Sequence, residues 1–313
     1  MCLALTSCKD KVSDGFVAHQ ENSAAEGHFV YSSDENGNLQ IWEYANGIQT
    51  EIVADVNSEN WWPRLSPNGE ELIYYKSPLG NKLQKFEETT CWKRGMLTKV
   101  SVQLFEADPI WTHQGQTNWS HDAKSLVFSA LNDSSGHWQI FTSNSEGKEP
   151  TPISKRAGYD YFDPVFSLDD QSIFCSVVHE GESPESVEFE IFEIDRITGE
   201  ETRLTFNNTR DHHPDISIDG AFLAFESLDD PDYLSFGKWN IHKLDLTTLE
   251  ETPMITTDNL SFAPRFSQDG RFLYFINLDI LRFQTSLVQY ELPNGPSLNV
   301  SSDSVNSINV DPF

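Results

Sequence analysis

A fourteen-residue unit recurs along the chain at a spacing close to 50 residues, and this repeat constrains the fold more than any other feature. Five copies align on their serines, which are Ser66, Ser120, Ser167, Ser217 and Ser267. Their sequences are WPRLSPNGEELIYY, QTNWSHDAKSLVFS, DPVFSLDDQSIFCS, HPDISIDGAFLAFE and APRFSQDGRFLYFI. A weaker copy, EGHFVYSSDENGNLQIWEY, precedes them, so we expect six structural units in a row.

Each part of the unit has a physical role in a β-structure. Proline is expected to start a short strand, where its missing N–H is tolerated. Ser-x-Asp-Gly predicts a turn, because Asp or Asn accepts backbone hydrogen bonds and Gly adopts a positive φ. Ala123 and Asp170 replace the glycine in two copies. An apolar strand follows the turn, and a second alternating strand such as WQIFTS or FEIFEID comes after a further loop.

Four strands per unit, repeated six times without helical periodicity, predict an all-β fold, a six-bladed β-propeller of four-stranded antiparallel blades. The unit x-P-x-Φ-S-x-D-G-x-x-Φ-x-F also resembles the WD40-like repeat of TolB-like propellers, over most of residues 26–292. This resemblance implies an interaction module of the bacterial cell envelope. We predict that residues 26–295 form the propeller.

Two segments depart from the repeat. Residues 76–108 lack a clear second strand and concentrate lysine and arginine, so we expect a distorted second blade; an insertion or an exposed basic loop is the alternative. Residues 296–313 are rich in serine and asparagine, which favours a flexible tail, although SINV could instead add a closing strand.

The N-terminal residues contain a short apolar run that ends in Leu5-Thr6-Ser7-Cys8. This tetrapeptide resembles the lipobox of bacterial lipoproteins, which implies lipidation of Cys8 and export to the periplasm or to an outer-membrane anchor. The basic start and longer apolar stretch of a full signal are missing, so we interpret residues 1–25 as a truncated lipoprotein signal and linker.

The charge of the chain limits its partners. Asp and Glu number 49 against 21 Lys and Arg, which gives a formal net charge of −28. Such a surface repels phosphates, so we expect no nucleic-acid partner. No segment after the N-terminal run approaches the ~20 apolar residues that span a bilayer, so we expect contact with a membrane only through a lipid anchor. A monomer is expected.

The cysteines do not form a metal-binding pattern, since no two are spaced as C-x-x-C. Cys175 lies in the apolar run SIFCSVV and is interpreted as a small buried hydrophobic residue. A disulfide between Cys91 and Cys175 is the alternative.

In a propeller, the turn that leads into each innermost strand lies at one mouth of the central channel. The residues just before each proline should therefore gather there, and we predict a binding surface of aromatic, histidine and carboxylate side chains. Its predicted members are Asn60, Trp61, Trp62, Tyr161, Phe162, Asp163, Asp211, His212, His213 and Phe262. An acidic rim is expected from Asp34, Glu35, Asp133, Glu180, Glu182, Glu185, Asp229, Asp230, Asp232 and Asp279. The alternative is an ordinary channel mouth with solvated loops.

A divalent metal at this mouth is a second hypothesis, with Asp163, Asp211, His212 and His213 as candidate ligands. Adjacent side chains on an extended strand point to opposite sides, which argues against His212 and His213 binding one ion together. We therefore assign no cofactor and no catalytic residue, and we predict a non-enzymatic binding or scaffold protein with a protein or glycan partner. The alternative is a metal-dependent carbohydrate-active enzyme similar to oligogalacturonate lyases.

Overall fold

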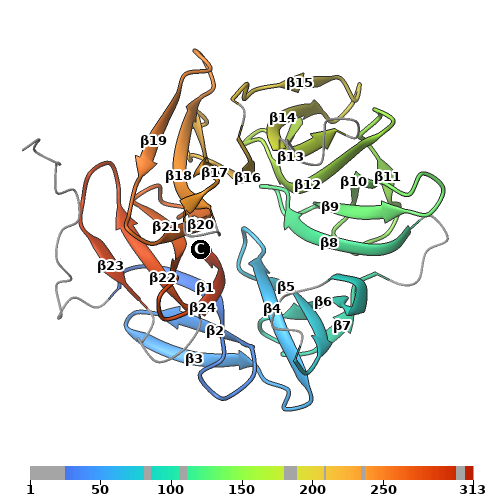
Figure 1. The fold of residues 1–313 in the computed structure, drawn as a ribbon. Helices are drawn as coiled ribbons and strands as arrows, with labels where there is room; N and C mark the ends of the chain where they lie inside the picture. The colour runs from blue at the N-terminus through green and yellow to red at the C-terminus, as the bar shows by residue number, and fades with distance from the viewer. Residues whose placement is uncertain are drawn as a thin grey trace, which may run out of the picture.

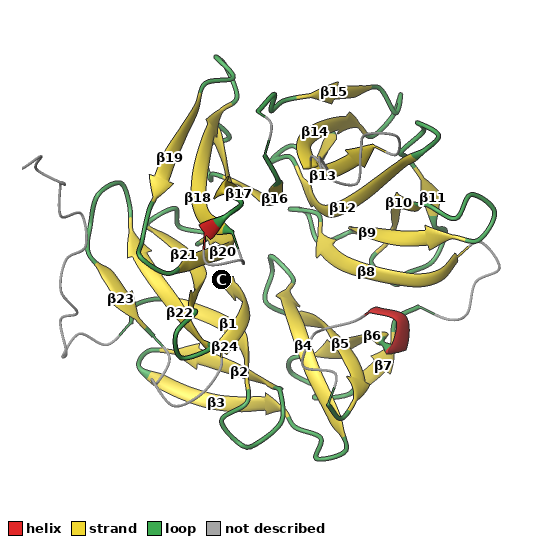
Figure 2. Ribbon diagram, in the orientation of Figure 1, coloured by secondary structure: helices red, strands yellow, loops and turns green. Residues whose placement is uncertain are grey.

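A computed structural model describes residues 25–80, 86–105, 111–179, 189–207, 209–233, 237–300 and 307–312. These residues form six four-stranded antiparallel sheets, arranged as blades around a central channel (Figure 1). They contain no α-helix, and the short segments coloured red in Figure 2, such as Phe86–Glu88, are 3-10 turns. The all-β, six-bladed propeller predicted from the repeat is confirmed.

Each blade runs from an innermost strand at the channel to an outermost strand at the perimeter. In that order, blade one contains β24 (Ser307–Pro312), β1 (His28–Ser33), β2 (Gln40–Ala45) and β3 (Ile48–Val53). Blade two contains β4 (Ser58–Leu65), β5 (Glu71–Pro78), β6 (Thr90–Gly95) and β7 (Ser101–Gln103). Blade three contains β8 (Trp111–Trp119), β9 (Ser125–Asn132), β10 (Trp138–Asn144) and β11 (Thr151–Pro152). Blade four contains β12 (Tyr159–Phe166), β13 (Ser172–His179), β14 (Phe189–Asp195) and β15 (Glu201–Arg203). Blade five contains β16 (Asp211–Ile216), β17 (Phe222–Asp230), β18 (Lys238–Asp245) and β19 (Glu251–Ile255). Blade six contains β20 (Leu260–Phe266), β21 (Phe272–Asp279), β22 (Gln284–Glu291) and β23 (Ser297–Asn299).

The ring is closed by the two ends of the described chain. β24 pairs antiparallel with β1 and becomes the innermost strand of blade one, so the C-terminus lies near the channel (Figure 1). The segment 296–313 therefore supplies the outer strand β23 and the closing strand β24. Joining the ends in one sheet removes the free edges that an open row of blades would expose.

The serine of each repeat fixes the turn between the first two strands of a blade. In blade five, Ser217 Oγ donates to Asp219 Oδ1 at 2.7 Å and accepts from the backbone N–H of Phe222 at 3.1 Å. The equivalent serine-to-Asx bonds measure 2.7–2.8 Å in the other four aligned copies. The Ser-x-Asp pattern is thus a side-chain hydrogen-bonded turn, as the sequence predicted.

The prolines do not start the strands, contrary to the sequence prediction. Pro63, Pro164, Pro214 and Pro264 lie inside β4, β12, β16 and β20, each beside a β-bulge. The residue before each proline, and its counterparts in β8 and β24, has a φ between 49° and 56°. These six residues are Trp62, Gln116, Asp163, His213, Ala263 and Asn309. The bulge interrupts the hydrogen-bond ladder locally, so the missing proline N–H is tolerated there.

The expected distortion of blade two is wrong for the residues described there. β6 and β7 pair in register with β5 and with each other, and β6 buries Cys91 and Lys93. This strand was not predicted from TCWKRG because a lysine is not expected at a buried strand position. Lys93 is buried here and forms ion pairs with Glu71 and Glu146, at 2.9 and 2.6 Å. Cys91 and Cys175 are both free and fully buried, so no disulfide links them.

The turn geometry predicts a stabilising substitution, Ala123→Gly. Ala123 has a φ of 58° at the position where three other copies have glycine. A left-handed conformation costs an L-residue about 1–2 kcal/mol, more than the entropic cost of glycine. We expect a gain of about 0.5–1 kcal/mol in the free energy of unfolding, measured by urea denaturation.

The matched control is Gly220→Ala, which places a Cβ at a φ of 69° and 3.2 Å from Leu168 Cδ1. It should lose about 1 kcal/mol. Equal effects of both substitutions would contradict this account of the turn.

Candidate functional site at the channel mouth

Five of the six positive-φ residues lie together at one end of the channel. Trp62, Asp163, His213 and Ala263 border one small cavity, and Gln116 bonds to Asp163. Trp62 of blade two reaches His213 of blade five, with ring centroids 5.6 Å apart. Because these blades are not neighbours, the contact crosses the axis. Arg64 lies over the Trp62 ring at 4.5 Å, and Trp62 is 5% exposed. The channel is therefore filled by side chains at this level.

Asp163 is the centre of a buried polar network at the mouth. Its Oδ1 lies 3.1 Å from His213 Nε2, and its Oδ2 lies 3.5 Å from His212 Nδ1. Gln116 donates to its Oδ1 and accepts from its backbone N–H. On the other side of His213, Nδ1 lies 3.1 Å from Glu226 Oε1. Blades three, four and five are joined through this chain of contacts.

The strand bulge explains why both histidines face Asp163. On a regular extended strand His212 and His213 would point to opposite sides, as the sequence analysis assumed. The left-handed φ of 49° at His213 breaks that alternation. That assumption was wrong at this position.

The charges at the mouth stabilise one another. Burial lowers the pKa of His213, but the carboxylates of Asp163 and Glu226 outweigh it and raise this pKa to about 9. Burial raises the pKa of Asp163, and the two histidines more than offset this and hold it below its ordinary value. At neutral pH the site is an imidazolium between two carboxylates.

A continuous arc of aromatic side chains surrounds this network. Neighbouring rings along it have centroids 4.2–6.5 Å apart, so each ring contacts the next. All of its members are partly exposed. We name this set the aromatic arc; in order it contains Phe86, Trp138, Phe162, Phe189, His212, Trp239 and Phe262.

The arc alternates between two kinds of position. Phe162, His212 and Phe262 lie two residues before the prolines of their innermost strands, whereas Trp138, Phe189 and Trp239 lie at or next to the starts of third strands. Each third-strand ring packs on the innermost-strand ring of the next blade. The sequence analysis found the first set and missed the second. The aromatic residue that begins WQIFTS, FEIFEID and WNIHKLDL was the available signal.

The innermost strand of blade three contributes no ring to the arc, and Phe86 of blade two occupies that place. Its innermost strand has Gly115 where blades four to six have Phe162, His212 and Phe262. Phe86, from the 3-10 turn η1 (Phe86–Glu88), fills the space, and a Cβ on Gly115 would lie 2.6 Å from its ring. Glycine is therefore required here for a close approach.

Four of the predicted site residues are buried inside the blades. Trp61 is fully buried, stacks on Tyr75 at 5.3 Å and donates to Ser77. Tyr161 donates to Glu201 at 2.9 Å. The other two, Asn60 and Asp211, bond to Gln40 and to Ser227, both at 2.7 Å. These four residues lie inside the blades beside the mouth, while Trp62, Phe162, Asp163, His212, His213 and Phe262 lie at it.

The four candidate metal ligands do not all converge, because Asp211 lies apart from the other three. Asp211 faces Ser227 and Asn207, whereas Asp163 is paired with the two histidines. Across the part of the chain that the structure describes, no group of three or more His, Cys, Asp or Glu side chains could hold a metal ion.

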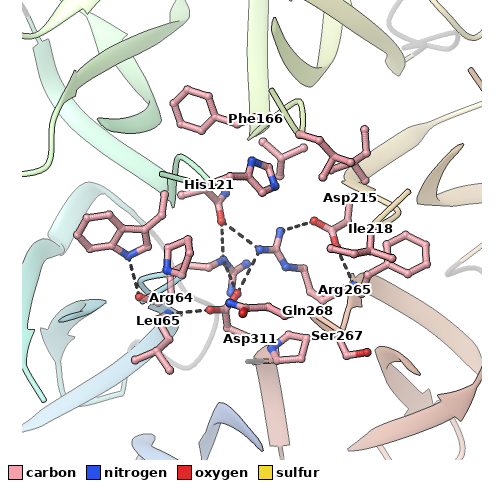
Figure 3. Close-up of a pocket in the computed structure, with 18 residues that line it drawn as sticks. Arg64, Leu65, His121, Phe166, Asp215, Ile218, Arg265, Ser267, Gln268 and Asp311 are labelled. Atoms are coloured by element: carbon pink, nitrogen blue, oxygen red, sulfur yellow. Dashed lines mark hydrogen bonds and ion pairs between the residues drawn. The ribbon is translucent and has the colours of Figure 1, made fainter. Parts of the chain in front are cut away.

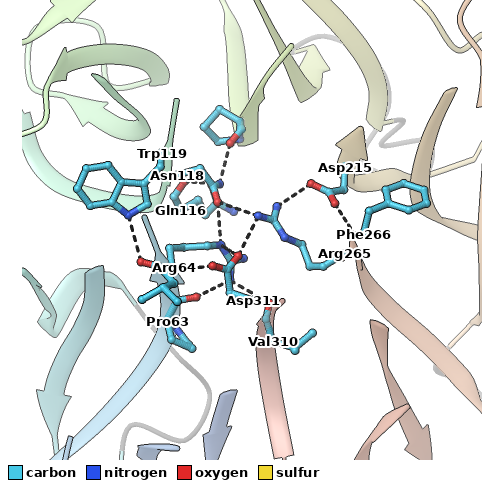
Figure 4. Close-up of polar contacts among 12 residues, drawn as sticks. Pro63, Arg64, Gln116, Asn118, Trp119, Asp215, Arg265, Phe266, Val310 and Asp311 are labelled. Atoms are coloured by element: carbon cyan, nitrogen blue, oxygen red, sulfur yellow. Dashed lines mark hydrogen bonds and ion pairs between the residues drawn. The ribbon is translucent and has the colours of Figure 1, made fainter. Parts of the chain in front are cut away.

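A second layer of polar residues lies two positions after the positive-φ residues, deeper in the channel (Figure 4). Arg64 Nε donates to Asn118 at 2.7 Å, and Arg265 bridges Asp215 and Asp311 at 3.0 and 3.1 Å. We call these five residues the polar belt. It also ties blades together through backbone groups, because Phe266 donates to Asp215 and Leu65 donates to Asp311, both at 2.7 Å.

The sequence analysis missed the polar belt, although the repeat alignment contains it. Counting back two residues from each aligned serine gives Arg64, Asn118, Val165, Asp215 and Arg265. Charged residues at one fixed position of a repeat, next to its apolar strand, were the signal. Asp311 could be added only once β24 was known to close the ring.

The described residues include part of the predicted acidic rim. Asp133 and Asp232 are exposed on loops between second and third strands, and Asp229 and Asp230 are exposed at the end of the second strand β17. Glu180, Glu182, Glu185 and the predicted lipidation site Cys8 lie outside the described residues.

No helix in the described ranges is long and apolar enough to cross a bilayer.

The paired histidines predict a pH dependence of stability. His242, like His213, lies between two carboxylates: burial lowers its pKa, but Asp229 and Glu251 raise it to about 9. Protonated His213 and His242 stabilise the folded state, because their pKa in the folded protein lies above the unfolded value of 6.5. This stabilisation is fully present below pH 6.5 and is lost as the pH rises towards 9. The melting temperature should therefore fall between pH 7 and 9, by an amount equivalent to about 1–3 kcal/mol per histidine.

The variants His213→Gln and His242→Gln should each flatten this decline when melting is followed by differential scanning fluorimetry. A decline that is equally steep in both variants and in the natural chain would contradict the assignment.

Gly115→Ala should lower the free energy of unfolding by about 1–3 kcal/mol, because its Cβ overlaps the Phe86 ring. Combining it with Phe86→Ala should remove most of that extra cost in a double-mutant cycle measured by urea denaturation. The same cost in both backgrounds would show that Phe86 does not occupy this space.

No protein-family model and no curated protein matches this sequence. Solved structures do match its fold. TolB from Acinetobacter baumannii superposes with a TM-score of 0.69 at 14% identity, covering 91% of this chain and 66% of that one. This chain therefore spans slightly less than two thirds of the length of that TolB. A chain of a nidogen/laminin complex gives a TM-score of 0.65 at 7% identity, covering 91% and 98%.

An oligogalacturonate lyase from Vibrio parahaemolyticus gives a TM-score of 0.57 at 11% identity, covering 82% of this chain and 73% of that chain. At these identities the matches describe the fold alone. The chain has the fold of TolB-like six-bladed β-propellers, as its repeat predicted.

Proposed function

We propose that this chain is a non-enzymatic binding or scaffold protein of the bacterial cell envelope, exported to the periplasm or anchored to the outer membrane through Cys8. It presents the channel-mouth face to a protein or glycan partner. The observation that carries this proposal is the aromatic arc, a partly exposed band of seven rings at one face.

The arc has the chemistry of a recognition surface. Aromatic rings supply a large contact area with little conformational entropy to lose, and they stack equally well on peptide side chains and on the C–H faces of sugars. His212 adds a polar atom within the arc, next to the buried carboxylate of Asp163 at 3.5 Å. An apolar band with a few fixed polar groups is typical of ligand-binding surfaces.

Exposed apolar side chains on the same face extend this surface. They lie on the loops that open at the mouth. These loops join the second strand of a blade to its third strand, or the last strand of a blade to the first strand of the next blade. Five large ones are more than half exposed: Val56 (82%), Leu79 (54%), Phe206 (67%), Leu281 (88%) and Phe283 (69%). Beside the aromatic arc, these side chains add apolar area that a partner could cover.

Charge narrows the partner class. Four exposed aspartates lie on this face, Asp133 and Asp232 on loops and Asp229 and Asp230 at the end of β17, and the whole chain carries a net charge of −28. A partner with cationic groups would be attracted, whereas an acidic polyuronate would be repelled. The shared fold with TolB and with a chain of the nidogen/laminin complex supports a protein partner by analogy alone.

The test compares two double variants of the full chain. Phe206→Ser with Phe283→Ser removes two exposed rings from the mouth face. Each lost aromatic contact is worth about 1–2 kcal/mol, so capture of the partner from envelope extract should weaken at least about tenfold. Binding is measured by photo-crosslinking to the immobilised chain and by a glycan array.

The matched control is Leu97→Ser with Ile197→Ser, two side chains of 95% and 81% exposure on turns of the opposite face. It should bind like the natural chain, and both variants should melt like it. Equal binding by all three chains would overturn the assignment of this face.

A further inference from the structure

A cavity of about 300 Å³ opens at the end of the channel opposite the mouth (Figure 3). Its outer wall comes from the turns that follow the innermost strands, including Pro67, His121, Leu168, Ile218 and Gln268. Its floor is the polar belt. This volume is at the lower end of the range for small-molecule sites.

The floor of the cavity contains matched charges. The two guanidinium groups of Arg64 and Arg265 face the two carboxylates of Asp215 and Asp311 (Figure 3). Opposite charges are therefore equal in number across the belt. A ligand with a full charge of either sign would meet a like charge as well as an opposite one.

The belt has hydrogen-bonding capacity left over after its internal contacts. Arg64 donates hydrogen bonds through Nε and Nη1, whereas Arg265 donates through Nη2 and forms an ion pair with Asp215 through Nη1. Arg64 Nη2 and Arg265 Nε donate to none of the described residues. Each carboxylate oxygen of Asp215 and Asp311 has a hydrogen-bond or ion-pair partner at 2.7–3.1 Å and keeps a lone pair for a further donor. The floor thus offers donors and acceptors side by side.

The walls of the cavity are largely apolar. Val165 replaces a polar residue in the blade-four position of the belt, and Ile216, Leu168 and Ile218 continue the apolar wall outward. Ile218 lies at the opening and is 53% exposed. The cavity therefore combines an apolar side with a neutral floor of alternating donors and acceptors.

From this combination we infer that the cavity binds a small neutral polyhydroxylated ligand, of the class of a single sugar ring. Each hydroxyl of such a ligand both accepts and donates, so neighbouring hydroxyls can bond to a guanidinium and a carboxylate of the belt at once. The C–H face of the ring would lie against Val165 and Ile216. This site is separate from the mouth and does not depend on the proposed function.

The test uses the full chain and three neutral sugars as probes, D-glucose, D-galactose and N-acetyl-D-glucosamine. Saturation-transfer NMR and isothermal titration calorimetry should detect binding of at least one of them. Ile218→Trp, which narrows the opening without touching the belt, should weaken that binding by about tenfold or more. Arg265→Lys removes the guanidinium fork and should weaken it similarly.

The matched control is Ile197→Trp, at an 81% exposed position on an outer turn of the same face, and it should bind like the natural chain. If Arg265→Lys lowers the melting temperature strongly, Ile218→Trp alone decides the question. Absence of binding by all three sugars, or unchanged binding by Ile218→Trp, would overturn the inference. D-Galacturonate and glycine betaine serve as charged and zwitterionic comparison probes in the same assays. Binding of either of them without binding of a neutral sugar would also overturn the inference. Because Phe206 and Phe283 are intact in these variants, the mouth-face test can fail or succeed independently.

Discussion

Pairing of β24 with β1 is the interaction on which the other features of the molecule depend. It turns a row of six sheets into a ring and places Asp311 at the channel, 246 residues from its hydrogen-bond partner Leu65. Asp311 also lies 3.1 Å from Arg265 of blade six, so one side chain joins three blades. Without closure, neither the polar belt nor the contact of Trp62 with His213 across the axis would form.

The repeat was sufficient to predict the blades because each copy carries its own turn. Ser217 and Asp219 close that turn with side-chain bonds that need no distant partner. The bulge at His213 was not predictable in the same way, since a Pro inside a strand usually marks its beginning. Blade two was misjudged because β6 buries Lys93, a charge that only Glu71 and Glu146 from elsewhere make tolerable.

The mouth was predicted in outline and only partly in its residues. Counting back from the prolines found Phe162, His212 and Phe262, but the arc also needs Trp138, which joins them only when two blades lie side by side. Trp61 looked equivalent to Phe162 in the alignment. It is fully buried because Phe86 and Tyr75 pack against it, and that contact depends on a turn between β5 and β6. Pairings between blades are tertiary facts that a repeat does not contain.

The two ends of the channel differ in chemistry because the same strands carry different side chains on either side of the bulge. The mouth has aromatic rings around an imidazolium between carboxylates, and the far end has balanced arginine and aspartate beside apolar walls. Closure by β24 holds both ends in place. The most direct test of that claim is hydrogen exchange on a chain lacking residues 307–313, compared with the full chain. Faster exchange throughout the innermost strands β4, β12, β16 and β20 is the result expected if closure organises the channel, whereas a change confined to β1 would contradict it.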